Sequence, residues 1–407
     1  MVLLKLAFRN ISRNKRRSWI TILSVGVGLG ALIFLWSFGD GTNYQMRENV
    51  ISLSTGHIQI HAKGFEKSLS PELLLPEHDP VLAKLQTLPE VLAKTERIRF
   101  EALIGTSEHS RGVLLVGIDP LHEPAVTRLE KFMVRGSYLA PRDPRSVLIG
   151  SRLAEKLKVD LGDKVVVMTQ TIDGTMSGFA FRVRGIFHAG SQPLDEMTAF
   201  ISLPASQELL GVENRVHEIV LRLKNSNLVP RVKANLGSKL DPNAIEVLAW
   251  NEIIPEVEQW VSWSEAVIRT ILMAVMVVIG VGIMNTVLMS VFERKKELGV
   301  MMALGTSPFQ IFLLIVLETL ILEFFGILLG LIGGTLVTYY FSIVGIGFPE
   351  LEQAFSRSYM STVTYTRVEF AHVVQSVITL VLMASFIGLY PAWKAGRTEP
   401  VKAIYHS

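Results

Sequence analysis

The stretch ERKKELGVMMALGTSP, residues 293–308, lies between two segments that are hydrophobic enough to cross a bilayer. Residues 270–292 before it contain no charged side chain, and residues 309–343 after it contain only Glu318 and Glu323. A helix needs about 20 predominantly apolar residues to cross a hydrocarbon core of about 30 Å. The sequence therefore predicts two membrane spans joined by a short charged segment.

Two further segments have the same character. Residues 18–39 carry no charge, and residues 370–393 carry only His372. The first is longer than the roughly 7–15 apolar residues of a secretory signal, and no A-x-A-like cleavage site follows it, so it is interpreted as a retained anchor. We predict an α-helical membrane protein with four transmembrane helices, at residues 18–39, 266–292, 309–343 and 370–393.

Basic residues cluster beside these spans. They precede the first span, follow the second within the charged segment, and follow the fourth in the tail, residues 394–407. The positive-inside rule places all three clusters in the cytoplasm. Both termini are then cytoplasmic, and residues 40–265 and the link 344–369 lie outside the cell membrane.

Residues 1–17 have a helical pattern of their own. Apolar residues recur at helical spacing, and basic residues occupy the other side of the helix. This pattern predicts an amphipathic helix on the inner leaflet. An unstructured basic flank that only sets the topology is the alternative. The apolar set is Leu4, Ala7, Phe8 and Ile11, and the basic set is Lys5, Arg9, Arg13 and Arg16.

Residues 40–265 change from long apolar segments to short β-branched ones, which are typical of half-buried strands. We predict a large α+β domain of two lobes outside the membrane, one of them an insertion at about residues 112–211. Trp250, Trp260 and Trp263 precede the second span, where they either anchor the helix at the interface or pack under the domain. The predicted strands are 57–62, 164–171, 179–187, 199–203 and 217–223, and the predicted helices are 151–158, 204–210 and 229–240.

Composition and motifs exclude several classes of function. The 407 residues carry a net charge of +3 without a basic stripe, so no nucleic-acid partner is predicted, and the absence of cysteine excludes disulfides. No G-x-x-x-x-G-K-[ST], H-E-x-x-H or G-x-S-x-G motif occurs. His57 and His61 would share a strand face, but a structural role is favoured over a metal site. We predict no catalytic residue, bound cofactor or metal in this chain.

Two carboxylates inside the third span need an explanation, because such groups are costly in lipid. We interpret Glu318 as a hydrogen-bonding contact between helices, with a substrate or proton path as the alternative, and expect Glu318→Gln to be mild. The role of Glu323 stays open. Glycines spaced by four in this span, and others in the first, predict close helix packing within the chain or with a second copy. They are Gly326, Gly330 and Gly334, with Gly26, Gly28 and Gly30 in the first span.

Three segments in order carry a resemblance to a known family. They are LAFRNISRNKRRSWITILSVGVGLGALI near the N-terminus, the segment beginning ERKKELGVMMALGTSPFQIF, and YPAWKAGRTEPVKAIY near the C-terminus. With the large domain after the first span, the chain resembles the FtsX-like, MacB-type permeases of ABC transporters. GHIQIHAKGF and VLIGSRLAEKLKVDLGDKVVV are more similar to the lipoprotein-releasing (LolC/LolE-like) branch than to the antibiotic-exporting branch.

The resemblance implies a non-catalytic permease subunit in a bacterial inner membrane, with residues 40–265 in the periplasm. This subunit would transmit ATP-driven movement to that α+β periplasmic domain of two lobes, a MacB-like periplasmic core domain. ATP and Mg would be bound by a separate ATPase present in two copies. Residues 293–308 would form the cytoplasmic coupling helix, and a solvated loop is the alternative. Relatives often carry arginine where Met302 stands, and Glu323 has no counterpart in the family pattern. The predicted ATPase contacts are Glu293, Arg294, Glu297, Leu298, Gly299, Met302 and Gly305.

The same resemblance suggests what the complex does. A second permease, identical or paralogous, would complete the pair, and the cargo would be a lipoprotein or another amphiphile, with a periplasmic carrier as a further partner. The alternatives are MacB-like efflux of peptides or drugs and FtsX-like regulation of a cell-wall hydrolase.

Overall fold

The computed structural model describes the chain except for residues 1, 77, 142, 349, 351–362 and 398–407. Parts of the predicted link 344–369 and of the tail 394–407 therefore lie outside the described residues. The chain divides into two compact units. The first, the helical unit, comprises Met1–Tyr44, Val261–Gly347 and Val363–Ser407, and the second, the sheet unit, comprises Gln45–Trp260 and Phe348–Thr362.

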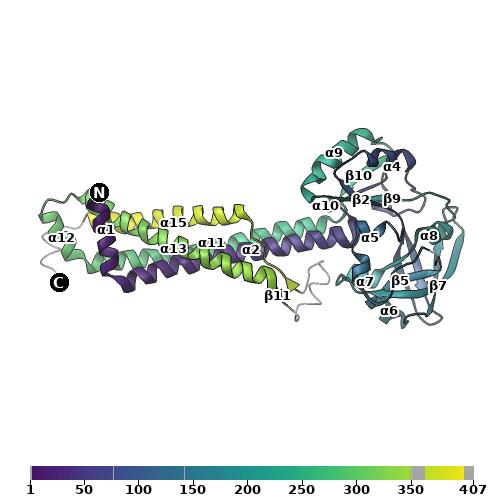
Figure 1. Ribbon diagram of the computed structural model, residues 1–407, viewed down its shortest axis with the longest axis horizontal. Coiled ribbons are helices and arrows are strands. Elements are labelled where there is room, and N and C mark those ends of the chain that lie inside the picture. The colour runs from purple at the N-terminus through teal and green to yellow at the C-terminus, as the bar shows by residue number, and fades with distance from the viewer. Residues whose placement is uncertain (1, 77, 142, 349, 351–362, 398–407) are drawn as a thin grey trace. The chain divides into compact units, whose positions relative to one another are not determined.

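The helical unit is built from long apolar helices (Figure 1). Among the described residues, four helices are long and apolar enough to cross a membrane, which confirms the predicted number of spans. Two of them, α2 and α11, are much longer than the apolar segments that predicted them, because partly polar turns at residues 40–50 and 255–265 continue the helices. The helices are α1 (Val2–Arg13), α2 (Lys15–Val50), α11 (Pro255–Glu293), α12 (Lys295–Ala303), α13 (Pro308–Val344) and α15 (Phe370–Gly396).

The spaced glycines bring α2 and α13 into close contact. A Cβ atom added to Gly334 would lie 2.8 Å from Gly30 Cα, and one added to Gly330 would lie 2.8 Å from Gly26 O. A Cβ atom on Gly326 would lie 2.6 Å from a side-chain carbon of Val25. Larger side chains would separate the two helices, so these glycines make a contact within the chain.

A polar contact joins α2 to α15 toward the far end of the helical unit from α1. Asp40 Oδ2 lies 2.7 Å from His372 Nδ1, and the imidazole stacks on Trp36 with 4.1 Å between the ring centroids. The one histidine of the predicted fourth span thus has a partner on α2. Trp263, in α11, is largely exposed.

The sheet unit contains one mixed ten-stranded sheet. Its strand order is β10-β1-β9-β2-β3-β8-β5-β7-β4, and β6 pairs with both β2 and β7. The strands are β1 (Ile58–Ala62), β2 (Val91–Gly105), β3 (Ser110–Ile118), β4 (Met133–Gly136), β5 (Ser146–Gly150), β6 (Lys164–Gln170), β7 (Met176–Phe187), β8 (Thr198–Ser202), β9 (Glu218–Leu223) and β10 (Ile245–Ala249). A separate pair, β11 (Ile346–Gly347) and β12 (Val363–Thr364), belongs to the helical unit.

Strands from the predicted insertion are neighbours at one end of this sheet, and those flanking it are neighbours at the other. One large apolar core includes residues from both ends, so the two predicted lobes share a sheet and a core. The helices of this unit are α3 (Phe65–Ser68), α4 (His78–Gln86), α5 (Glu123–Val126), α6 (Ser151–Leu157), α7 (Gln192–Met197), α8 (Leu203–Leu210), α9 (Val229–Lys239) and α10 (Trp250–Ile253), with short helical turns at Ile51–Thr55, Leu129–Phe132 and Ser226–Leu228.

Candidate functional site: the junction of α1, α12 and α13

The turn between α11 and α12 directs Arg294 into the protein. Its side chain is only 9% exposed, and its Nη1 donates to both oxygens of Glu318 on α13, at 3.0 and 3.1 Å. Asn10 on α1 donates to the same carboxylate, with 2.6 Å from Nδ2 to Oε1. This buried group, the Arg294–Glu318–Asn10 triad, joins three segments that lie far apart in the sequence.

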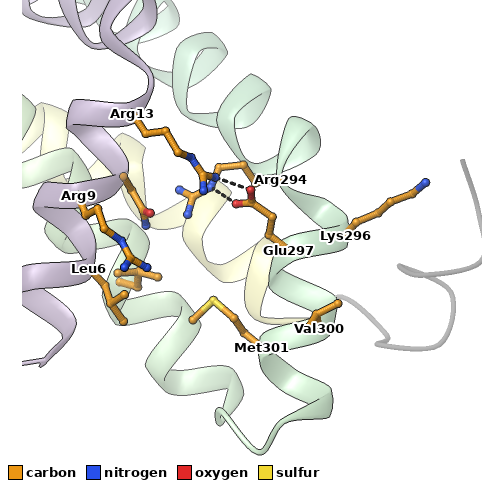
Figure 2. A pocket seen from close by; sticks show the side chains of 10 residues that line it. Leu6, Arg9, Arg13, Arg294, Lys296, Glu297, Val300 and Met301 are labelled. Carbon is orange, nitrogen blue, oxygen red and sulfur yellow. Dashed lines mark hydrogen bonds and ion pairs between the residues drawn. The ribbon is translucent and has the colours of Figure 1, made fainter.

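Glu297 connects the triad to a second arginine. Its carboxylate accepts from Arg294 Nε at 3.0 Å and from Arg13 on α1, as Figure 2 shows. Partial burial opposes ionisation of Glu297, but the hydrogen bonds from Arg294 and Arg13 outweigh it and lower the pKa of this carboxyl. Burial likewise opposes the charge on Arg294, yet Glu318 outweighs it and raises the pKa of the guanidinium. Both groups therefore stay charged at neutral pH.

Local sequence explains where α12 ends and α13 begins. Gly305 has φ of 99°, a conformation that L side chains rarely adopt, and it follows the last turn of α12. Ser307 then caps α13: its Oγ accepts from the Gln310 backbone N–H at 3.3 Å, and its own N–H donates to Gln310 Oε1 at 3.0 Å. Pro308 occupies the first turn, where a missing N–H costs nothing.

The apolar side chains that are exposed at α12 differ from those that the sequence predicts. Leu298 is only 2% exposed and packs in the core of the helical unit, and Gly299 is also buried. Val300 is 46% exposed and Leu304 is 83% exposed. Leu298 is therefore not available at the surface for the predicted contact, whereas Val300 and Leu304 are exposed.

The remaining predicted contact residues lie around this helix. Glu293 is about half exposed and lies 3.6 Å from Arg17 Nη1, measured from its Oε2. Met302 is partly buried and packs against the same core as Leu298. The sequence predicts Arg13 and Asn10 in a surface helix and assigns neither a partner, because nothing in the local pattern indicates pairing with residues 284 and 308 positions away.

A cavity of about 480 Å³ opens between α1 and α12 (Figure 2). Its lining combines four cationic side chains with one carboxylate and several apolar groups. The guanidinium of Arg9 has no ion-pair partner among the described residues, unlike those of Arg13 and Arg294. The lining residues are Leu6, Arg9, Asn10, Arg13, Arg294, Lys296, Glu297, Val300, Met301 and Leu314.

These groups are suited to a protein contact and to the transmission of movement. Among the described residues, no group of three or more histidines and carboxylates could hold a metal ion. The two histidines of β1 and its N-terminal flank have other contacts: His57 accepts a hydrogen bond from Leu223 N and contacts Ser226 Oγ at 3.0 Å, and His61 lies 3.1 Å from Glu246. Both imidazoles are buried in the sheet unit, and burial lowers the pKa of each to about 4.

Four bilayer-length helices, with a sheet-rich domain inserted after the first, define a multi-span membrane protein with a large domain outside the lipid. Two family models match it. The MacB-like periplasmic core domain matches residues 18–239, more than half of the chain, and the FtsX-like permease C-terminal region matches residues 269–400. The chain belongs to the FtsX-like, MacB-type family of ABC transporter permeases.

Individual proteins and one solved structure are similar to this chain. The chain is 26% identical over 404 residues to the lipoprotein-releasing system transmembrane protein LolC of Xylella fastidiosa, covering 95% of this chain and 93% of that protein. It is 22% identical to the macrolide export ATP-binding/permease protein MacB of Acinetobacter baylyi, covering 98% of this chain and 59% of that one. The periplasmic region of MacB from Actinobacillus actinomycetemcomitans aligns with 52% of this chain and 97% of its own length, with a TM-score of 0.36 and 15% identity.

Proposed function

We propose that this permease is the membrane subunit of a lipoprotein-releasing ABC transporter. In this proposal a separate ATPase binds α12, and ATP-driven movement of α12 displaces the sheet unit, which extracts a lipoprotein or a similar amphiphile from the membrane. The Arg294–Glu318–Asn10 triad is the observation that carries the proposal, because it fixes the exposed helix α12 to α13 and α1. The full-length similarity to LolC supports this choice of cargo.

The proposed path of movement follows contacts that the helical unit contains. A push on α12 reaches α13 through the Arg294–Glu318 ion pair. α13 passes it to α2 through the glycine contact, where no side chains intervene to absorb a displacement. α2 and α11 each contain residues of both units, since α2 ends at Val50 and α11 begins at Pro255.

The ATPase is proposed as a separate chain, in two copies that bind ATP and Mg. The A. baylyi relative is named an ATP-binding/permease protein, and this chain covers only 59% of it. The phosphate-binding motif G-x-x-x-x-G-K-[ST] does not occur in this sequence. A second permease would complete the pair, with both termini of each in the cytoplasm and the sheet unit in the periplasm. Export of peptides or drugs is the second candidate, favoured by the MacB relatives.

The exposed face of α12 gives the sharpest test. Leu304→Asp places a charge on a side chain that is 83% exposed, so folding and insertion should be retained while ATPase binding falls. We expect loss of co-purified ATPase and of lipoprotein release from reconstituted vesicles. Met176→Asp, at a 75% exposed methionine of the sheet unit, is the matched control and should keep the ATPase.

Normal ATPase binding and coupling by Leu304→Asp would refute the docking assignment. The orientation is tested separately by labelling with a membrane-impermeant thiol reagent. Ser177→Cys should be labelled from the periplasmic side, and Ser307→Cys only after permeabilisation. Labelling of Ser307→Cys from the outside would overturn the topology.

A further inference from the structure

Glu323 is a buried carboxylate without a partner. It lies near the middle of α13, is only 3% exposed, and neither of its oxygens has a hydrogen-bond partner among the described residues. An unsatisfied polar group is strongly unfavourable at membrane depth, because no water is there to solvate it. Glu318, five residues earlier on the same helix, differs in having Arg294 and Asn10 as donors.

A cavity adjoins this carboxylate. It has a volume of about 350 Å³ and lies between α13 and α15. Most of its lining is apolar, and Thr319 uses its hydroxyl to donate to the Ile315 carbonyl of its own helix at 3.0 Å. Glu323 is therefore the one ionisable group in the lining. The lining residues are Val316, Thr319, Leu320, Glu323, Leu382, Ser385, Phe386, Gly388 and Leu389.

The cavity has an open side and a closed side. Phe386 is 77% exposed and Leu382 is 66% exposed, which places both side chains at the rim of the cavity. In a membrane-spanning helix, such exposed side chains face the surroundings of the bundle. Gly388 lies at the closed side, where an added Cβ would be only 3.3 Å from Thr319 Cγ2. The volume falls within the range of about 300–1,000 Å³ that is typical of small-molecule pockets.

We propose that this cavity binds an amphiphile with a protonated amine, which enters from the lipid. The ammonium N–H groups donate to the Glu323 carboxylate, and the apolar part of the molecule lies along Leu382, Phe386 and Leu389. The carboxylate then gains the donor that the chain does not supply, as buried charges require. This site is separate from the α12 junction and does not depend on the function proposed above.

The shape of the site favours a small molecule over the helix of another protein. A helix with its side chains is about 10–12 Å across, and Leu382 and Phe386 project from the rim where such a helix would have to approach. An alkyl chain is narrower and more flexible than a helix. We therefore favour a group at the end of a slender chain as the partner of Glu323.

The test uses the full-length chain in nanodiscs of zwitterionic phospholipid. The probes are a photoreactive dodecylamine and the matching photoreactive dodecanol, and labelled residues are mapped by mass spectrometry. We expect the amine to label residues of α13 and α15 around the cavity in the wild type, and about tenfold less in Glu323→Gln. The alcohol should label both proteins equally. Glu369→Gln, which removes a carboxylate just before α15, is the control and should keep amine labelling.

Equal labelling by the two probes, or amine labelling that Glu323→Gln leaves unchanged, would overturn the proposal. If Glu323→Gln fails to fold, competition in the wild type decides: unlabelled dodecylamine should displace the amine probe, and unlabelled dodecanol should not. Disulfide formation between two copies carrying Leu382→Cys, together with absence of amine labelling, would mean that a second copy covers the cavity, and would also refute the amine site.

Discussion

Replacing Glu318 with leucine removes the acceptor shared by Arg294 and Asn10. The arginine side chain is 9% exposed and keeps only its contact from Nε to Glu297, whose own side chain is about half exposed. Removing one member of a buried ion pair costs about 3–5 kcal/mol, because the other charge stays buried without compensation. The surviving contact to Glu297 places Glu318→Leu near the lower end, at about 3 kcal/mol of unfolding free energy.

The double variant Glu318→Leu/Arg294→Met makes this estimate testable. It removes both charges and leaves only the Asn10 amide unsatisfied, at about 1–3 kcal/mol. Replacing a whole buried pair by apolar side chains is often neutral. We therefore expect the double variant to be more stable than Glu318→Leu, although it carries one more substitution. The assay is denaturant or thermal unfolding of the purified protein in mild detergent, with each single variant measured alongside.

Two results would refute this reasoning. One is a Glu318→Leu variant as stable as the wild type, and the other is a double variant whose loss equals the sum of the single losses. Glu318→Gln removes the charge of the side chain and keeps its shape. The sequence alone predicts a mild effect, because an amide keeps hydrogen bonding. The structure predicts a larger loss, because the amide leaves the buried Arg294 with only the half-exposed Glu297 as its counter-charge.

Two further predictions concern other parts of the chain. Gly334→Val should destabilise the helical unit by several kcal/mol or prevent its folding, because its Cβ would lie 2.8 Å from Gly30 Cα. The control Gly333→Val should be tolerated, because its Cβ meets nothing within 4 Å. Equal melting temperatures of the two variants would contradict the glycine contact. Acid should destabilise the sheet unit through His57. Burial lowers the pKa of His57 in the folded protein to about 4, so the unfolded state takes up the proton first as the pH falls. The free energy of unfolding should therefore fall by up to about 3 kcal/mol as the pH drops from about 6.5 to about 4. Hydrogen exchange of full-length protein across this range should show a smaller loss in His57→Gln, and an identical pH profile would contradict the assignment.

The parts of the fold that the sequence predicts are those with a strong local pattern. The four spans follow from charge-free length, and β6 follows from strict alternation, since Val165, Val167 and Thr169 are buried while the residues between them are exposed. The long strand β2 was not predicted. Its segment KTERIRFE carries charged residues at five of eight positions, yet Arg97 and Ile98 are both buried, which means that this part of the sheet is covered on both faces.

Buried arginines in β2 show why the local pattern misleads. Arg97 makes two hydrogen bonds to Glu123, with 2.6 Å from Nη2 and 3.1 Å from Nε, and Arg99 Nε lies 2.8 Å from Glu218. Each carboxylate comes from a distant part of the chain. A charged residue is predicted to be exposed unless its partner is known, and the sequence does not reveal the partner.

The same limit applies to the candidate site. Sequence reasoning placed α12 between the second and third spans and identified its residues, but it assigned Leu298 to the surface because it lies at the centre of a charged segment. The structure buries Leu298 and turns Arg294 inward, since the break between α11 and α12 rotates the following helix relative to the preceding span. The direction of a side chain after such a break depends on the packing of α12 against the bundle, and no local periodicity encodes it.

The two carboxylates of α13 illustrate how position along one helix separates structural from binding roles. Glu318 lies within reach of the basic end of the bundle, where Arg294 and Asn10 donate hydrogen bonds to its carboxylate. Its charge therefore holds α1, α12 and α13 together. Glu323 lies more than one turn deeper, at a level of α13 that those donors do not reach, and it faces a cavity instead of a side chain. If the only role of this residue were helix packing, leucine would serve equally well at that level of the helix. An ionisable group there, beside an open apolar cavity, is better explained by a donor that arrives from outside the chain.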